Sequence, residues 1–213
     1  MMRHRASRVA ALLLTAGALA LTGCAGVTDP TRYYVLSSTV AAPNDSARTA
    51  DSSAGIGVGV GPVMIPRYLD RVQIVTRGAN DDVDISMYHR WAEPLESGIA
   101  QVLADDLAQQ VGSERIAVFP WRGAAARMLD YQVVVVVMRF EGSPGHQVML
   151  DARWRLLSKD GKELVLKRST INELVTGNGY QALVLGMNRV LGTLAREIAA
   201  EIRSLADARA SGS

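Results

Sequence analysis

Five consecutive valines, at 133–137, constrain the fold of this chain more than any other feature. β-Branched side chains favour extended backbone, and an apolar run without alternation is typical of a strand buried on both faces. We therefore expect 131–140 to be a central strand of a sheet. The glycines and proline of 142–145 favour a turn, so the chain should reverse directly after this strand.

The segment after that turn has the pattern of a half-buried antiparallel strand. Between 147 and 156, apolar side chains alternate with charged ones, which places one face on the core and the other in solvent. Asp160 and Gly161 favour a tight hairpin, followed by a strand at 163–175. Shorter strands are expected at 33–36, 56–65, 72–76, 83–91 and 116–120.

Two segments have the period of an amphipathic helix. Pro94 suits a first helical turn and Gly112 suits the position just past a helix end, with apolar residues at helical spacing between them. A longer apolar stripe follows Asn178, a residue type favoured at helix caps, and leaves 208–213 as a disordered tail. The sequence therefore predicts an α+β fold: an antiparallel-dominated sheet with two helices packed on one face.

The first 23 residues predict a secretory signal. Three arginines precede an apolar stretch, 9–21, that is too short to span a bilayer. The run Leu21-Thr22-Gly23-Cys24 then has the lipobox pattern: an aliphatic residue, two small residues and a cysteine. We expect cleavage before Cys24 and a covalent lipid on its thiol; the alternative is an ordinary signal with a chance cysteine. Cys24 is the only cysteine of the chain, so lipidation would leave no free thiol and no disulfide.

Charge excludes one class of partner. The whole chain has 23 basic and 21 acidic residues, but three of the arginines lie in the signal, which leaves 20 basic and 21 acidic residues in the mature chain. A nucleic-acid-binding protein would instead carry a concentrated basic patch. The 190 residues after the signal have the size of one domain. We expect a tether at 24–30, one domain at 31–207 and the tail at 208–213.

The tether places the domain near a membrane. Six extended residues between Cys24 and the domain reach about 20 Å, so the domain should lie close to the lipid surface. Ala25 follows the cysteine, whereas an Asp there retains lipoproteins in the inner membrane of many Gram-negative bacteria. The expected location is therefore the outer membrane, facing the periplasm.

Residues that carry catalysis or bind metals are sparse. The mature chain has two histidines, His89 and His146, far apart in sequence, whereas zinc sites need three or four ligands with a close-spaced pair. No serine lies in a Gly-x-Ser-x-Gly elbow. We expect His89 to have a packing or surface role and His146 to be exposed in a turn. The sequence predicts neither an enzyme nor a cofactor beyond the covalent lipid.

Two segments are candidates for contacts with partners. Between two expected strands lie Arg67, Tyr68, Asp70 and Arg71. Tyr and Arg are residue types that contribute strongly to interfaces. Either they form an exposed surface for self-assembly or partner binding, or they form a structured turn held by Arg–Asp pairs. The Ser-, Ala- and Asp-rich segment 37–54 is expected to be a flexible loop, an insertion or an interaction segment.

Several motifs together resemble one family, the PqiC-type ABC-transport auxiliary lipoproteins. They are Tyr33-Tyr34-Val35-Leu36-Ser37, Ile56-Gly57-Val58-Gly59-Val60-Gly61-Pro62-Val63, the run from Pro66-Arg67-Tyr68-Leu69-Asp70-Arg71 through Val72-Gln73-Ile74-Val75-Thr76-Arg77, and Arg90-Trp91-Ala92-Glu93-Pro94-Leu95. The resemblance covers about 31–205 in the same order.

The resemblance implies a non-enzymatic lipoprotein, anchored in the inner leaflet of the outer membrane, that works with MCE-domain proteins. Those proteins form periplasmic assemblies that move lipids between the two membranes. On this basis we expect a docking subunit for an MCE assembly. The alternative is a structural envelope lipoprotein that binds the cell wall or another outer-membrane component.

Overall fold

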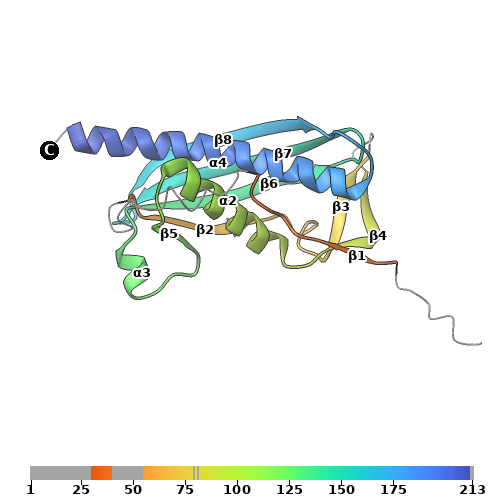
Figure 1. Cartoon of the computed structure of the whole chain (residues 1–213), viewed down its shortest axis with the longest axis horizontal. Helices are drawn as coiled ribbons and strands as arrows, with labels where there is room; N and C mark the ends of the chain where they lie inside the picture. Colours follow the sequence, from red (N-terminus) through yellow and green to blue (C-terminus); the bar gives the residue numbers. More distant parts are fainter. Residues whose placement is uncertain (1–29, 40–54, 79, 81, 212–213) are drawn as a thin grey trace, which may run out of the picture. The chain divides into compact units, whose positions relative to one another are not determined.

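Two β-sheets, of five and three strands, and two long helices form the described part of the chain (Figure 1). The structure is a computed structural model that describes residues 30–39, 55–78, 80 and 82–211. The larger sheet has the order β5–β2–β6–β7–β8 and the smaller one β1–β4–β3. The strands are β1 Arg32–Tyr34, β2 Val58–Met64, β3 Gln73–Arg77, β4 Val83–Trp91, β5 Ile116–Val118, β6 Tyr131–Gly142, β7 Gln147–Ser158 and β8 Glu163–Leu174.

Strand direction divides the larger sheet into two parts. β2 runs parallel to both of its neighbours, β5 and β6, whereas β6, β7 and β8 form an antiparallel meander. The α+β class is confirmed, and the second sheet is an addition to the single sheet that we expected. The smaller sheet forms because β4 pairs with β1 at its end and with β3 along its length. β2, which lies between β1 and β3 in sequence, joins the larger sheet instead.

The valine run forms the predicted central strand. β6 lies between β2 and β7, and Val133, Val135 and Val137 belong to the hydrophobic core. Val134 points to the opposite face and is also buried, while Val136 on that face is half-buried. Both faces of the strand are therefore largely shielded from water, in agreement with the unbroken apolar run.

A β-bulge changes the orientation of side chains near the end of β6. Val137 pairs with Ala152 of β7, but the next pair joins Arg139 to Asp151, so one extra residue lies on the β6 side. Beyond the bulge Phe140 enters the core, and Glu141 points to the face away from the helices. Without the extra residue the alternation would have turned Glu141 toward the apolar core.

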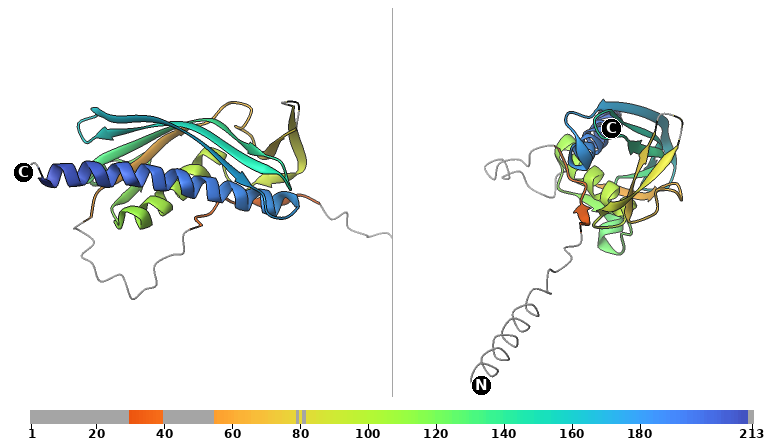
Figure 2. Two further views of the ribbon diagram at one scale, coloured as in Figure 1. Left: turned by 90° about the horizontal axis from the view of Figure 1, so that it is seen from above. Right: turned by 90° about the vertical axis from the view of Figure 1, so that its right-hand side faces the viewer.

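The predicted helices are α2, Leu95–Val111, and α4, Gly179–Ser211. Both cover the same face of the five-stranded sheet (Figure 2). Pro94 lies at the N-cap, one residue before the first turn in which we expected it. Gly112 ends α2 in the left-handed conformation with φ of 68°, as the sequence predicted. The expectation of a disordered tail from 208 was wrong for 208–211, because α4 continues to Ser211. A one-turn helix, α3 Ala124–Arg127, was not predicted.

Part of the expected loop 37–54 is held against the helices. The backbone N–H of Ser37 donates to Asn188 Oδ1 at 3.1 Å, and the Ser38 hydroxyl donates to Asp106 Oδ1. Asp106 is fully buried on α2. Residues 40–54 lie outside the described residues. Within the described ranges, no helix is long and apolar enough to cross a membrane.

Candidate functional site

The loop between β2 and β3 is a structured turn. The backbone N–H of Leu69 donates to the Pro66 carbonyl at 2.9 Å, and the Leu69 side chain is buried in the core. Arg67 and Asp70, on either side of it, are exposed, and Arg71 is half-buried. Buried Leu69 and backbone hydrogen bonds hold this turn. Among the described residues, no ion pair joins Asp70 to either arginine of the loop.

Tyr68 does not lie on the exposed surface where we expected it. Its ring is half-buried against the core, and its hydroxyl donates a hydrogen bond of 2.7 Å to Glu141 Oε2. The Arg77 guanidinium lies 6.0 Å from the centre of the tyrosine ring. The composition of the loop did not indicate a buried carboxylate that accepts a hydrogen bond from the Tyr68 hydroxyl.

Glu141 is the centre of this cluster. Its side chain is only 1% exposed, and its Oε1 accepts hydrogen bonds from Arg77 Nε at 2.7 Å and Arg139 Nε at 3.0 Å. Burial raises the pKa of the carboxyl group, but the hydrogen bonds from Tyr68, Arg77 and Arg139 outweigh it and hold the pKa below its ordinary value. The carboxylate is therefore ionised at neutral pH.

The same contacts keep the Tyr68 hydroxyl protonated. Burial and the hydrogen bond to the Glu141 carboxylate raise the pKa of Tyr68 to about 12. The loop is thus fixed to β6 by a charge-assisted hydrogen bond, and β3 is fixed to the same carboxylate through Arg77. We call these four side chains, Tyr68, Arg77, Arg139 and Glu141, the Glu141 cluster.

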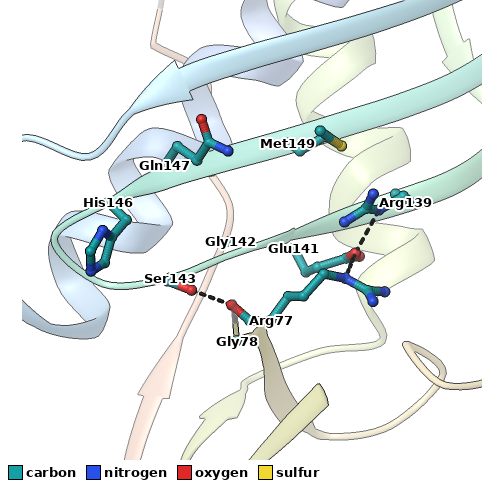
Figure 3. A pocket seen from close by; sticks show the side chains of 9 residues that line it. All are labelled: Arg77, Gly78, Arg139, Glu141, Gly142, Ser143, His146, Gln147 and Met149. Atoms are coloured by element: carbon teal, nitrogen blue, oxygen red, sulfur yellow. Dashed lines mark hydrogen bonds and ion pairs between the residues drawn. The ribbon is translucent and has the colours of Figure 1, made fainter. Parts of the chain in front are cut away.

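A groove of about 490 Å³ lies beside the Glu141 cluster, at the turn between β6 and β7 (Figure 3). The Ser143 hydroxyl donates to the Arg77 carbonyl, so it is engaged in holding β3. His146 is exposed in the turn, as predicted. The groove offers polar groups for recognition. It is lined by Arg77, Gly78, Arg139, Glu141, Gly142, Ser143, His146, Gln147 and Met149.

Comparison with known proteins identifies the family. Residues 34–199 match the family described as "ABC-type transport auxiliary lipoprotein component". The chain belongs to this family. It is a family of transport auxiliary lipoproteins and not of enzymes. None of the curated proteins compared with this auxiliary lipoprotein matches it.

Two crystal structures have the fold of the auxiliary lipoprotein. One, of an uncharacterised protein, is 20% identical with a TM-score of 0.64 and aligns over 81% of this chain and 98% of its own. The other, protein XCC0632 of Xanthomonas campestris from the DUF330 family, is 17% identical with a TM-score of 0.61. That alignment covers 84% of this chain and 99% of the Xanthomonas protein. At these identities the similarity concerns the fold alone.

His89 has the packing role that we expected. Its Nδ1 lies 2.8 Å from the Tyr34 hydroxyl, and its ring stacks on Tyr180 with the ring centres 3.8 Å apart. The histidine thereby joins β1, β4 and the start of α4. Burial lowers the pKa of His89, which favours the neutral ring in this stack. Among the residues that the structure describes, no group of side chains could hold a metal ion.

Exposed apolar side chains on the smaller sheet were missed from the sequence. On β4, Val83, Ile85 and Met87 are exposed and alternate with Asp84 and Ser86. The alternation was the available signal, because it is the pattern of a strand with one apolar face. Within the described residues, this part of β4 keeps its apolar side chains exposed. Cys24, the predicted lipid attachment site, lies outside the described residues.

Proposed function

We propose that this auxiliary lipoprotein is a non-enzymatic docking subunit, which seats a periplasmic MCE assembly at the outer membrane in intermembrane lipid transport. The observation that carries the proposal is the fixed loop between β2 and β3. The hydrogen bond from Tyr68 to Glu141 and the buried side chain of Leu69 hold the loop, while Arg67 and Asp70 remain exposed. A surface that is already ordered before binding loses less conformational entropy when a partner docks.

The membrane attachment follows from the sequence and the family. The family is one of lipoproteins, and Cys24 is the only cysteine. We place the lipid on Cys24 and, because Ala25 follows it, assign the anchor to the inner leaflet of the outer membrane. Two or more acyl chains make such an anchor effectively permanent.

A charge-reversal experiment tests the docking surface. The double variant Arg67→Glu/Asp70→Lys keeps the net charge and replaces only exposed side chains, so the fold should be retained. We expect its affinity for the purified MCE protein of the same transport system to fall at least tenfold, as surface plasmon resonance would measure.

A matched control is Arg127→Glu/Asp160→Lys, which exchanges the same residue types at exposed positions on α3 and in the turn between β7 and β8. It should bind like the wild type. If the wild-type lipoprotein does not bind the MCE protein at all, the docking function is wrong. In that case the role of a structural envelope lipoprotein would be tested by binding to peptidoglycan.

A further inference from the structure

A shallow groove of about 540 Å³ lies between β1 and the start of α4. Three large apolar side chains on its walls are exposed: Tyr33 by 63%, Val35 by 54% and Leu185 by 50%. Neighbouring residues of the same segments, Leu36 and Leu183, belong to the core. The groove is lined by Arg32, Tyr33, Tyr34, Val35, Ser37, Gln181, Val184, Leu185 and Asn188.

The groove is held in a fixed shape from behind. Tyr34 bonds to His89, and the backbone of Ser37 bonds to Asn188 on α4. Because side chains alternate along an extended segment, fixing Tyr34 and Leu36 inward turns Tyr33 and Val35 outward. The exposed apolar side chains therefore belong to a rigid surface, to which β1 and α4 both contribute residues.

The charge of the groove differs from that of the exposed apolar strip on β4, formed by Val83, Ile85 and Met87. Arg32 is the one charged residue among those that line the groove, and none of them is acidic. The strip on β4 instead has Asp84 between its apolar residues and Asp82 beside them. Apolar and aromatic side chains with a neighbouring cation are suited to phospholipid headgroups, whereas carboxylates are repelled by lipid phosphates.

The length of the chain before the groove selects its occupant. Tyr33 is nine residues after Cys24, so the extended chain between them spans about 30 Å at most. An acyl anchor on Cys24 therefore keeps this surface within that distance of the bilayer.

From these observations we propose that the groove between β1 and α4, the β1–α4 groove, rests on the phospholipid surface of the anchoring membrane. Tyr33, Val35 and Leu185 lie at the boundary between headgroups and acyl chains, and Arg32 lies beside the lipid phosphates. This inference depends on the lipid anchor of the proposed function. It adds an orientation, in which the α4 end nearest β1 faces the membrane.

The test uses the full lipidated protein in vesicles. Because Cys24 would carry the lipid, an introduced cysteine would be the single reactive thiol, which can be labelled with an environment-sensitive fluorophore. The positions are Val35→Cys and Leu185→Cys in the groove, with Lys159→Cys in the exposed β7–β8 turn as control. The vesicles contain phosphatidylethanolamine and phosphatidylglycerol, with or without a lipid that carries a nitroxide quencher near the headgroup.

We expect quenching at both groove positions to exceed that at the control at least threefold. Equal quenching at all three positions would overturn the proposal. A fluorescence change at the groove positions that requires the MCE protein or a second copy of the chain, and not the vesicles, would overturn it as well. Flotation with vesicles and the mass of the N-terminal peptide report the anchor separately. Normal flotation without quenching means that the orientation alone is wrong, whereas an unlipidated Cys24 would refute the anchor and the orientation together.

Discussion

The Tyr68 hydroxyl and the Glu141 carboxylate hydrogen-bond at 2.7 Å although 73 residues separate them in the chain. Through this contact the loop between β2 and β3 is fixed to the far end of β6. The exposed loop residues Arg67 and Asp70 therefore depend on the state of a buried carboxylate. Substitutions in the Glu141 cluster should change both the stability of the fold and the order of the loop.

Replacing Glu141 with Gln should destabilise the domain by about 3 kcal/mol, because Arg77 and Arg139 lose the charge that compensates their partial burial. Urea denaturation followed by circular dichroism measures this free energy. Glu163→Gln is the control, since Glu163 is exposed and lies 4.0 Å from Arg155, so its loss should cost under about 0.5 kcal/mol. Equal losses for the two variants would contradict the central role of Glu141.

Two substitutions of Tyr68 should separate its hydroxyl from its ring. Tyr68→Phe removes the hydrogen bond to a charged acceptor and should cost about 2 kcal/mol, whereas Tyr68→Ala also removes the ring from the core and should cost about 3 kcal/mol or more. Thermal unfolding measures both. An unchanged melting temperature for Tyr68→Ala would show that the ring makes no stabilising contact.

Val135→Asp should prevent folding of the domain. Val135 is fully buried in the middle of β6, and an unpaired carboxylate there cannot be solvated. The cost should exceed about 4 kcal/mol, which is a large part of the stability of a typical domain. Met138→Asp is a matched control in the same strand, at the exposed bulge position, and should retain a cooperative melt.

Asp106→Asn should stabilise the domain at pH 7. Burial raises the pKa of Asp106 in the folded state, more than the hydrogen bond from Ser38 lowers it. Because the pKa of Asp106 is higher in the folded state, the domain is most stable below the pKa of the unfolded state, about 3.9, and loses stability as the pH rises through the folded-state pKa. Asn carries no charge at any pH, so Asp106→Asn should raise the free energy of unfolding at pH 7 by about 1 kcal/mol.

Melting temperatures between pH 3 and pH 8 would test the sign of this effect. The gain from Asp106→Asn should disappear toward pH 3, where the carboxyl group is protonated in both states. Asp160→Asn, at an exposed position in the turn between β7 and β8, serves as the control and should not stabilise the domain at pH 7. A gain for Asp106→Asn that grows in acid would show the opposite linkage.

Cys24→Ser should block lipidation and leave an unprocessed precursor, because acylation precedes cleavage at a lipobox. Membrane fractionation and mass spectrometry of the N-terminus measure the result. Correct processing and membrane localisation of the variant would refute the assignment of Cys24 as the anchor.

Local signals in the sequence predicted many element boundaries well. Pro94 and Gly112 indicated the ends of α2, and alternation indicated the core face of β7, because both effects act within a few residues. The tail after 207 was predicted poorly, since the last turns of α4 contain good helix formers beyond the end of the apolar stripe.

The candidate site required information that lies outside any local window. Arg67, Tyr68, Asp70 and Arg71 were selected by composition, but the acceptor of the Tyr68 hydroxyl is on another strand. Glu141 points toward Tyr68 because a bulge at Met138 reverses the alternation of β6. A bulge depends on the pairing of two strands, so a single-strand pattern does not predict it.

The parallel placement of β2 has a consequence for the order of folding. Both of its neighbours, β5 and β6, come later in the chain, and its pairing with β6 extends to Val136, so β2 can complete its pairing only with residues far along the chain. The meander of β6, β7 and β8 instead closes through two short turns and needs only local contacts. Local contacts form faster than distant ones. We therefore expect the C-terminal meander to fold first and to serve as the template on which the N-terminal strands assemble.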